Sequence, residues 1–592
     1  MINQSYENSD RKMTDRELIK KTWVYIKPYK YRLFLALFLM ALMIVTDLIG
    51  PIFIQEIILK LQESSIDLEA IFSLVAVYAA IIATNSLVIY CNTMLLQHLG
   101  QSVIYDLRMK VFTHIDSLSV NQLNEIPVGS LVTRLTSDTN ALCDLFTNTL
   151  INLLKNFIFL IGVIGFMYYI NWFLALIISI YIPIIFVISI VFRKIARANY
   201  RKVRKNFSIM NAFLNENISG MKITQIFNQQ DRKKKEFDAL NQNIIKSRFK
   251  DVKIFSIYRP SISFLHFTAI FLTFLLGSME VLSGHLADIA YVFTFYLYVS
   301  KLFNPIQQIA DLFNGLQRAF TSSERLFNLL DTEPEVLDRP NAIELDHFEG
   351  RIEFKNVWFA YKEGEWILKD VSFVVEPKQV VAFVGATGAG KTTILQLIVR
   401  NYEVQQGEIL IDGINVNDIA INSLRKNIGQ MLQDVFLFSG TIRSNISLRD
   451  DEVPEDRIIE ACKYVNADTF INKLEKGLDE PVQERGENFS SGQRQLLSFA
   501  RTVVHDPQIL ILDEATANID TETEQVIQKS LLNMMNIGTM LIVAHRLSTI
   551  QHADNIICLQ HGKIIEQGNH QALLKKRGYY YNLYRLQFED QE

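Results

Sequence analysis

Residues 385–392 read Gly-Ala-Thr-Gly-Ala-Gly-Lys-Thr, and this stretch decides the fold of the C-terminal part of the chain. An apolar, β-branched run at residues 380–384 precedes it, and a helix-forming run at residues 394–398 follows it. A strand, a G-x-x-x-x-G-K-T loop and a helix in this order are typical of a phosphate-binding loop. Its glycines let backbone amides turn toward an anion, and the helix N-terminus adds the positive end of its dipole. The predicted nucleoside triphosphate site comprises Gly385, Ala386, Thr387, Gly388, Ala389, Gly390, Lys391, Thr392 and Thr393.

Two side chains of this loop have specific expected roles. Lys391 is expected to reach the β- and γ-phosphates, and the Thr392 hydroxyl is expected to ligate Mg²⁺. An ordinary glycine-rich turn is the alternative. The Lys-Thr pair at the start of the helix and the strand before it favour the phosphate loop.

The composition indicates a membrane part joined to a soluble part. Of the 592 residues, 49% are apolar and 21% are charged, and the mean hydropathy is +0.14. The net charge of −4 indicates no nucleic-acid partner. The four cysteines lie without metal or disulfide spacing, which favours reduced, buried thiols. They are Cys91, Cys143, Cys462 and Cys558.

The N-terminal half contains six apolar runs long enough to span a membrane. A capping box at residues 14–17 precedes them and begins a basic amphipathic helix, which is expected to lie along the membrane surface. One apolar tract is too long for a single span, and we divide it at Asn171 into a tight hairpin. The predicted spans cover residues 33–54, 71–96, 149–170, 172–192, 262–282 and 287–306.

The basic residues indicate how these spans are oriented. Lys and Arg concentrate at residues 27–32, 193–205 and 246–253, whereas the opposite loops carry none. By the positive-inside rule, the N-terminus and the nucleotide-binding part are cytoplasmic. The two long loops on that side, residues 98–144 and 196–253, have helical periodicity and are expected to extend into the cytosol. Breaks at residues 124–129 and 219–220 predict a short cross-helix in each.

An apolar strand with two carboxylates follows the phosphate loop by about 120 residues. It reads Gln-Ile-Leu-Ile-Leu-Asp-Glu at residues 508–514. Asp513 is expected to hold Mg²⁺ through water, and Glu514 to orient and deprotonate the attacking water. The spacing and order indicate a Walker B strand rather than a chance run of acids.

With these motifs in order, nearly the whole chain resembles a half-transporter of the ATP-binding cassette (ABC) exporters. Residues 127–139 are similar to the first coupling loop of that family, and residues 216–227 to its second. The resemblance implies that two chains pair and that the second coupling helix touches the partner's cassette. The expected fold is a membrane all-α domain of six transmembrane helices with long intracellular extensions, followed by an α/β P-loop ATPase domain. The expected parts are a cytoplasmic N-terminus and interfacial helix (1–32), a transmembrane domain (33–321), a linker (322–350) and a cassette (351–592).

The resemblance also assigns roles within the nucleotide site. It implies ATP and Mg²⁺ as cofactors, with Tyr361 stacked on adenine, Gln433 sensing Mg²⁺ and His545 at the γ-phosphate. Asp520 matches the D-loop. The segment Phe489, Ser490, Ser491, Gly492 and Gln493 occupies the signature position that faces the ATP of the partner chain.

This signature departs from the usual Leu-Ser-Gly-Gly-Gln. Phe489 replaces Leu, and Ser491 replaces the first Gly, which adds a Cβ where backbone approaches phosphate. Either serine is tolerated in a homodimer with two equal sites, or this chain belongs to a heterodimer. In the heterodimer, its Walker motifs complete the active site while its altered signature faces the weaker one. We favour the heterodimer, because a complete Walker B with an altered signature resembles one half of heterodimeric bacterial multidrug exporters.

The resemblance implies an ATP hydrolase in the bacterial cytoplasmic membrane. It would export hydrophobic or amphipathic small molecules by alternating access, in contact with membrane lipid. A lipid or lipid-precursor flippase, and an ATP-gated channel or regulatory subunit, are the alternatives. Asp47 lies inside the first span, where a charge is costly and by default functional, although pairing with a polar neighbour would also explain it. The candidate cavity residues are Asp47, Tyr296, Tyr298, Asn304 and Gln307.

Overall fold

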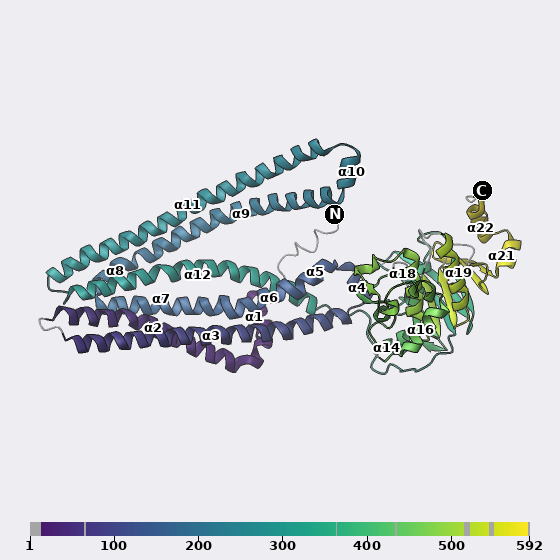
Figure 1. Ribbon diagram of the computed structural model, residues 1–592, viewed down its shortest axis with the longest axis horizontal. Helices are drawn as coiled ribbons and strands as arrows, with labels where there is room; N and C mark the ends of the chain where they lie inside the picture. Colours follow the sequence, from purple (N-terminus) through teal and green to yellow (C-terminus); the bar gives the residue numbers. More distant parts are fainter. Residues whose placement is uncertain are drawn as a thin grey trace. The chain divides into compact units, whose positions relative to one another are not determined.

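The computed structural model describes residues 13–63, 67–362, 364–431, 435–450, 452–513, 521–543 and 550–589 (Figure 1). The chain divides into two compact units. The first comprises Met1–Asp116 and Val128–Thr332, and the second comprises Ser117–Pro127 and Glu333–Glu592. The long connecting helix of the first unit ends at Leu330, so residues 322–330 of the predicted linker are helical. A short piece of the first predicted cytoplasmic loop belongs to the second unit.

The described residues of the first unit form helices and short connections, and some of these helices begin at caps that the sequence supplies. The Thr14 side chain and Glu17 form a capping box at the start of α1. Asn171 separates α7 from α8, and its side-chain oxygen accepts from the Leu174 amide at 2.9 Å. The helices are α1 (Asp15–Ile26), α2 (Lys30–Gln62), α3 (Leu68–Ser117), α5 (Val128–Thr133), α6 (Thr139–Asp144), α7 (Ile151–Ile170), α8 (Trp172–Ser179), α9 (Tyr181–Ser219), α10 (Met221–Ile226), α11 (Gln230–Leu282) and α12 (Ile289–Leu330).

Several of these helices run far beyond a bilayer's thickness. In the described part of the chain, five helical stretches are long and apolar enough to cross a membrane. The sixth predicted span falls in α12, which is not among the five. Two π-helical turns, Arg134–Asp138 and Leu145–Leu150, interrupt the stretch between α5 and α7. Helices α9 and α11 lie side by side, and α10 joins them at one end (Figure 1). This short helix begins directly after the second predicted break.

The second unit is built on two main sheets. A six-stranded sheet has the order β12-β11-β3-β10-β9-β6, in which every neighbouring pair except β11 and β12 is parallel. An antiparallel sheet has the order β2-β1-β4-β5, and β7 and β8 form a small pair. The strands are β1 (Ile352–Ala360), β2 (Trp366–Val375), β3 (Val380–Val384), β4 (Gln406–Ile411), β5 (Ile414–Asn415), β6 (Ile428–Met431), β7 (Gly440–Thr441), β8 (Pro481–Val482), β9 (Ile509–Asp513), β10 (Thr539–Val543), β11 (Asn555–Gln560) and β12 (Lys563–Gly568).

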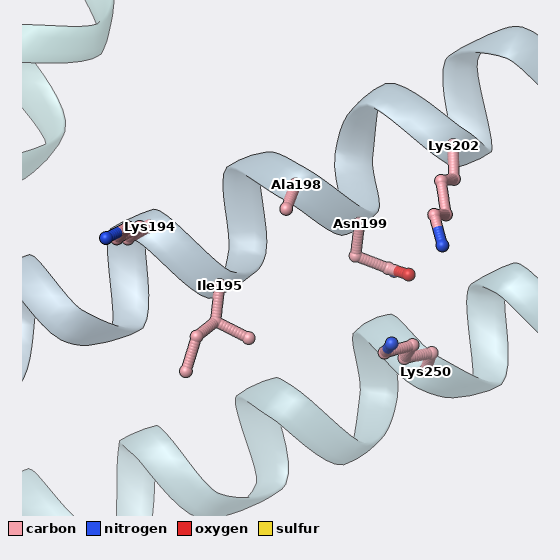
Figure 2. A pocket seen from close by; sticks show the side chains of 6 residues that line it. All are labelled: Lys194, Ile195, Ala198, Asn199, Lys202 and Lys250. Carbon is pink, nitrogen blue, oxygen red and sulfur yellow. The ribbon is translucent and has the colours of Figure 1, made fainter.

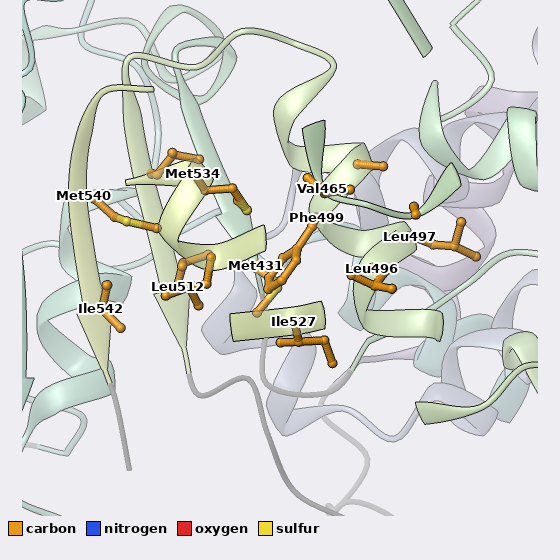
Figure 3. Packing of buried hydrophobic residues seen from close by; sticks show 14 of the residues in the cluster. Met431, Val465, Leu496, Leu497, Phe499, Leu512, Ile527, Met534, Met540 and Ile542 are labelled. Atoms are coloured by element: carbon orange, nitrogen blue, oxygen red, sulfur yellow. The ribbon is translucent and has the colours of Figure 1, made fainter. Parts of the chain in front are cut away.

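Helices cover the parallel sheet and close two hydrophobic cores. Strands β3, β9 and β10 are buried along their whole length, because parallel strands need apolar side chains on both faces. One core lies between the sheet and α18 and includes Met431, Phe499 and Leu512 (Figure 3). The other fills the space between the two sheets and α13. The helices are α4 (Val120–Glu125), α13 (Lys391–Ile398), α14 (Ile421–Lys426), α15 (Ile442–Ile446), α16 (Glu455–Tyr464), α17 (Asp468–Ile471), α18 (Ser491–Val503), α19 (Thr521–Met534), α21 (His570–Lys576) and α22 (Tyr579–Glu589).

Helix α4 belongs to the second unit through polar contacts with the segment that follows α12. The Ser119 hydroxyl and the Asn121 amide donate to the Glu335 carboxylate at 3.2 and 3.1 Å. The Gln122 side chain donates to the Glu333 carbonyl oxygen at 2.8 Å. A short helix therefore reaches into the first predicted break, and it is part of the unit that carries the phosphate loop.

Candidate nucleotide site

The phosphate loop follows β3 and turns on glycines that no other residue replaces easily. Gly385 has φ +155°, and a Cβ built there would lie 2.2 Å from the Leu559 carbonyl oxygen of β11. Gly390 has φ +103° and caps α13 in the left-handed conformation. Both positions therefore need glycine, one for close approach to a neighbouring strand and the other for its backbone conformation.

Lys391 and Thr392 begin the helix that follows the loop. The Lys391 ammonium is buried and donates to the carbonyl oxygens of Gly385 and Ala386 at 2.8 and 3.2 Å. The Thr392 hydroxyl donates to a carboxylate oxygen of Asp513, at the end of β9, at 3.2 Å. A hydroxyl beside a carboxylate is the hard-oxygen donor set that Mg²⁺ prefers, so these two residues fit the implied metal.

The parallel sheet explains why residues distant in sequence gather at this loop. Strands β6, β9, β10 and β3 are mutually parallel, and β10 lies between β3 and β9. The carboxyl ends of these strands lie at the edge of the sheet that carries the phosphate loop. The predicted site residues that follow β6, β9 and β10 lie outside the described residues. They are Gln433, Glu514, Asp520 and His545.

An aromatic cluster borders the same loop. The Tyr361 hydroxyl lies 3.1 Å from the Thr393 hydroxyl. Phe359 and Tyr402 both meet the Tyr361 ring edge to face, at centroid distances of 4.9 and 5.1 Å. Tyr361 remains 44% exposed, so its ring is held by neighbours and still accessible to a ligand. The sequence did not single out Tyr402, because its contact with Tyr361 is made only in the folded chain.

The signature segment begins α18. Ser490 caps the helix in a reciprocal capping box with Gln493. Phe489 is 6% exposed and belongs to the core beside the sheet, so its ring packs as a core side chain. Ser491 is the first residue of the helix, and Gly492 is buried behind it. Because Ser491 has helical backbone, serine there causes no backbone strain, and its added Cβ affects only what approaches the helix end.

The candidate cavity residues of the first unit divide into packed and accessible ones. Tyr298 is fully buried, and its hydroxyl donates to the Leu48 carbonyl oxygen at 2.6 Å. Tyr296 contacts the rings of Phe274 and Phe293. Asn304 is exposed and Gln307 is half-buried. Tyr298 is thus placed as a packing residue between α2 and α12.

Asp47 has polar neighbours on two other helices. The Asn85 amide of α3 donates to its carboxylate at 3.2 Å, and the Lys301 ammonium of α12 donates to its carbonyl oxygen at 2.7 Å. The Asn85 contact is the polar pairing that the sequence offered as one explanation for the Asp47 charge, and a role for Asp47 in the cavity stays a prediction. Asn85 and Lys301 were not recognised as its partners, because nothing in their spacing indicates that contact.

A P-loop nucleotide site on a mostly parallel sheet, in a chain that also carries long apolar helices, defines a membrane ATPase. Residues 33–306 match the ABC transporter transmembrane region, and residues 368–517 match the ABC transporter domain. The chain belongs to the ABC transporter family, as a half-transporter of the exporter type with one membrane domain and one cassette. It is an ATP-hydrolysing transporter.

Relatives of known or assigned function agree with this membership. The chain is 37% identical over 525 residues to the probable multidrug resistance ABC transporter ATP-binding/permease protein YheH of Bacillus subtilis, with 88% of this chain and 77% of that protein covered. It is 35% identical over 584 residues to the ATP-dependent lipid A-core flippase of Desulfotalea psychrophila, with 97% and 100% covered. Among solved structures, a bacterial Atm1-family ABC exporter with ATP bound matches with a TM-score of 0.77 and 25% identity, over 94% of this chain and 98% of that chain.

Proposed function

We propose that this chain exports hydrophobic or amphipathic small molecules across the cytoplasmic membrane as one half of a dimer. The observation that carries the proposal is the phosphate loop with its Thr392–Asp513 contact, in a chain whose other unit is a bundle of long apolar helices. The probable multidrug resistance relative supports a drug-like cargo. The basic residues at the ends of the apolar runs support a cytoplasmic location for the N-terminus and the cassette.

In this proposal, the two cassettes of the dimer enclose ATP between phosphate loop and signature. Lys391 neutralises phosphate charge, Thr392, Asp513 and Gln433 hold Mg²⁺, and Tyr361 supports the adenine ring. Glu514 orients the attacking water, His545 contacts the γ-phosphate, and Asp520 lies at the junction with the partner. ATP favours the closed cassettes and thus one orientation of the helices, and hydrolysis restores the other.

A lipid flippase is the second candidate, because the chain aligns with the full length of a lipid A-core flippase. The two functions differ in cargo and are separable in reconstituted vesicles. We expect ATP-dependent uptake of a fluorescent amphipathic dye by vesicles containing the purified protein. We expect no ATP-dependent change in the fraction of fluorescent phospholipid that dithionite bleaches. ATP-dependent translocation of that phospholipid without dye uptake would establish the flippase instead.

We further propose that the dimer is a heterodimer. The signature of this chain carries Ser491 where the usual sequence has glycine, and serine adds a side chain at the helix end that would face the partner's ATP. If so, the chain purified alone has little ATPase activity, and activity appears when it is purified with a second half-transporter. Full activity of the isolated homodimer would refute the heterodimer. Ser491→Gly in the active complex should then raise turnover at the weaker site.

A further inference from the structure

A basic hollow of about 340 Å³ lies between α9 and α11 (Figure 2). Its wall on α9 combines two lysines with Ile195, Ala198 and Asn199, and Lys250 of α11 completes it. The small Ala198 side chain leaves space between the helices. All of the lining residues belong to the first unit.

The floor of the hollow is fixed by hydrogen bonds. Asn199 is 4% exposed, and its amide donates to the Ser247 carbonyl oxygen at 3.0 Å and to the Asp251 carboxylate at 2.6 Å. These bonds hold α9 and α11 together at the base of the hollow. They also engage the Asp251 carboxylate, an acidic group close to the lining lysines.

Three lysines therefore line one hollow, Lys202 and Lys250 toward one end and Lys194 toward the other (Figure 2). Lys194, Lys202 and Lys250 are exposed, and an ammonium group has only donors. Like charges in one hollow repel each other unless an anion neutralises them. A phosphate group, with several acceptor oxygens, satisfies several ammonium groups at once, and lysine binds it as a point charge.

The position of the hollow along the membrane normal indicates the source of such a phosphate. The uncharged stretch of α9 ends at Arg193, and the hollow extends from Lys194 to Lys202, about 12 Å along the helix axis. Headgroups occupy roughly the outer 5–8 Å of each leaflet, so the hollow begins at headgroup depth. Ile195 follows Lys194 near the membrane end of the hollow and provides an apolar contact there.

We propose that this hollow binds the phosphate headgroup of an acidic phospholipid from the cytoplasmic leaflet. The basic side of the spans faces the cytoplasm by the positive-inside rule, and that leaflet carries the negative surface potential. The headgroup neutralises the three lysines, while its glycerol and acyl chains continue along Ile195. The site is independent of the cargo that the transporter carries.

The test measures the binding of phosphatidylglycerol to the full-length protein in detergent, with native mass spectrometry as the readout. In the test variant, Lys194, Lys202 and Lys250 are all changed to Gln. The matched control changes Lys205, Lys246 and Lys253 to Gln. These lysines lie on the same helices outside the hollow, so the control removes the same amount of charge as the test variant. A lysine near an acidic surface contributes a factor of about five in affinity. We expect the test variant to bind phosphatidylglycerol on the order of 100-fold more weakly than wild type, and the control to bind nearly as well.

Three further arms make the result decisive. Replacing the same three lysines with Arg should preserve binding, because the charge remains. Phosphatidylcholine should bind much more weakly than phosphatidylglycerol, and inorganic phosphate at the same concentration should not displace the lipid. Equal losses of phosphatidylglycerol affinity in the test and control variants would overturn the proposal, because the affinity would then depend on the total positive charge of the surface and not on the hollow. Displacement by inorganic phosphate would also overturn it, in favour of a soluble anion site.

Discussion

At the residue scale, the contact between Thr392 and Asp513 gives the strongest support for the predicted Mg²⁺ site. It joins the helix after the phosphate loop to the end of β9, two segments 121 residues apart in the sequence. Both residues were predicted as Mg²⁺ ligands from motifs read separately. The fold brings them within hydrogen-bond distance.

We predict that Thr392→Val weakens Mg²⁺ binding and ATP hydrolysis while the protein stays folded. Valine has the same shape but no hydroxyl, and the loss of a group that orients or ligates a metal typically costs about 10- to 100-fold. The measurement is ATPase rate against Mg²⁺ concentration. Thr469→Val removes an exposed hydroxyl in α17 and serves as control. An unchanged Mg²⁺ dependence in Thr392→Val would contradict the assignment.

The cassette cysteines give a second prediction at this scale. Burial raises the pKa of Cys462 and of Cys558 to about 12. A raised pKa lowers the thiolate fraction, which at pH 8 falls to about 1 in 10,000 against roughly a quarter for an ordinary thiol. We therefore expect iodoacetamide to spare both cysteines at pH 8 in the native protein and to modify both in urea, as read by peptide mass spectrometry. Rapid native labelling would show that these thiols are accessible.

At the element scale, the sequence predicted those features that depend on neighbouring residues in the chain. Residues 380–398 predicted strand, loop and helix, and Asn171 predicted the hairpin between α7 and α8, because caps and periodicity are local. The partners of Asp47 and the contact of Tyr402 with Tyr361 were missed, since each joins segments that only the fold brings together. The π-helical turn at Arg134–Asp138 also has no sequence signal that we recognised.

That π-helical turn carries a buried charge that α12 neutralises. Asp138 is 2% exposed, and the Arg325 guanidinium donates to both of its carboxylate oxygens, at 2.6 and 3.1 Å. Two charge-assisted hydrogen bonds between one guanidinium and one carboxylate are strong, and they fix the relative orientation of the two side chains. We infer that this pair fixes the position of the turn against α12.

We predict that Arg325→Met destabilises the protein strongly, because it leaves the Asp138 carboxylate buried without its counter-charge. Breaking a fully buried pair costs about 3–5 kcal/mol, and the half-exposed Arg325 reduces this to about 2 kcal/mol. Adding Asp138→Asn should recover much of the loss. The melting temperature in detergent is the measurement, and Lys60→Met, which breaks an exposed pair with Glu63, is the control. Equal melting temperatures for Arg325→Met and Lys60→Met would contradict this interpretation.

At the scale of the whole molecule, the chain joins a helical membrane unit to an ATPase unit, and residues of a predicted cytoplasmic loop belong to the ATPase unit. Within the ATPase unit, α4, which follows α3 in the chain, contacts Glu333 and Glu335. The relatives that share this architecture include a probable multidrug resistance transporter and a lipid A-core flippase.

The central claim is that ATP hydrolysis at this phosphate loop drives uphill transport, and one measurement tests it most directly. Sealed vesicles containing the active dimer, with the cassettes outside, are given an amphipathic dye and ATP, and the dye concentrations on the two sides are compared. We predict accumulation above the outside concentration for wild type. We predict none for Glu514→Gln, which should still bind ATP. Dye movement that stops at equal concentrations, or an ion current that rises with ATP without accumulation, would contradict the claim.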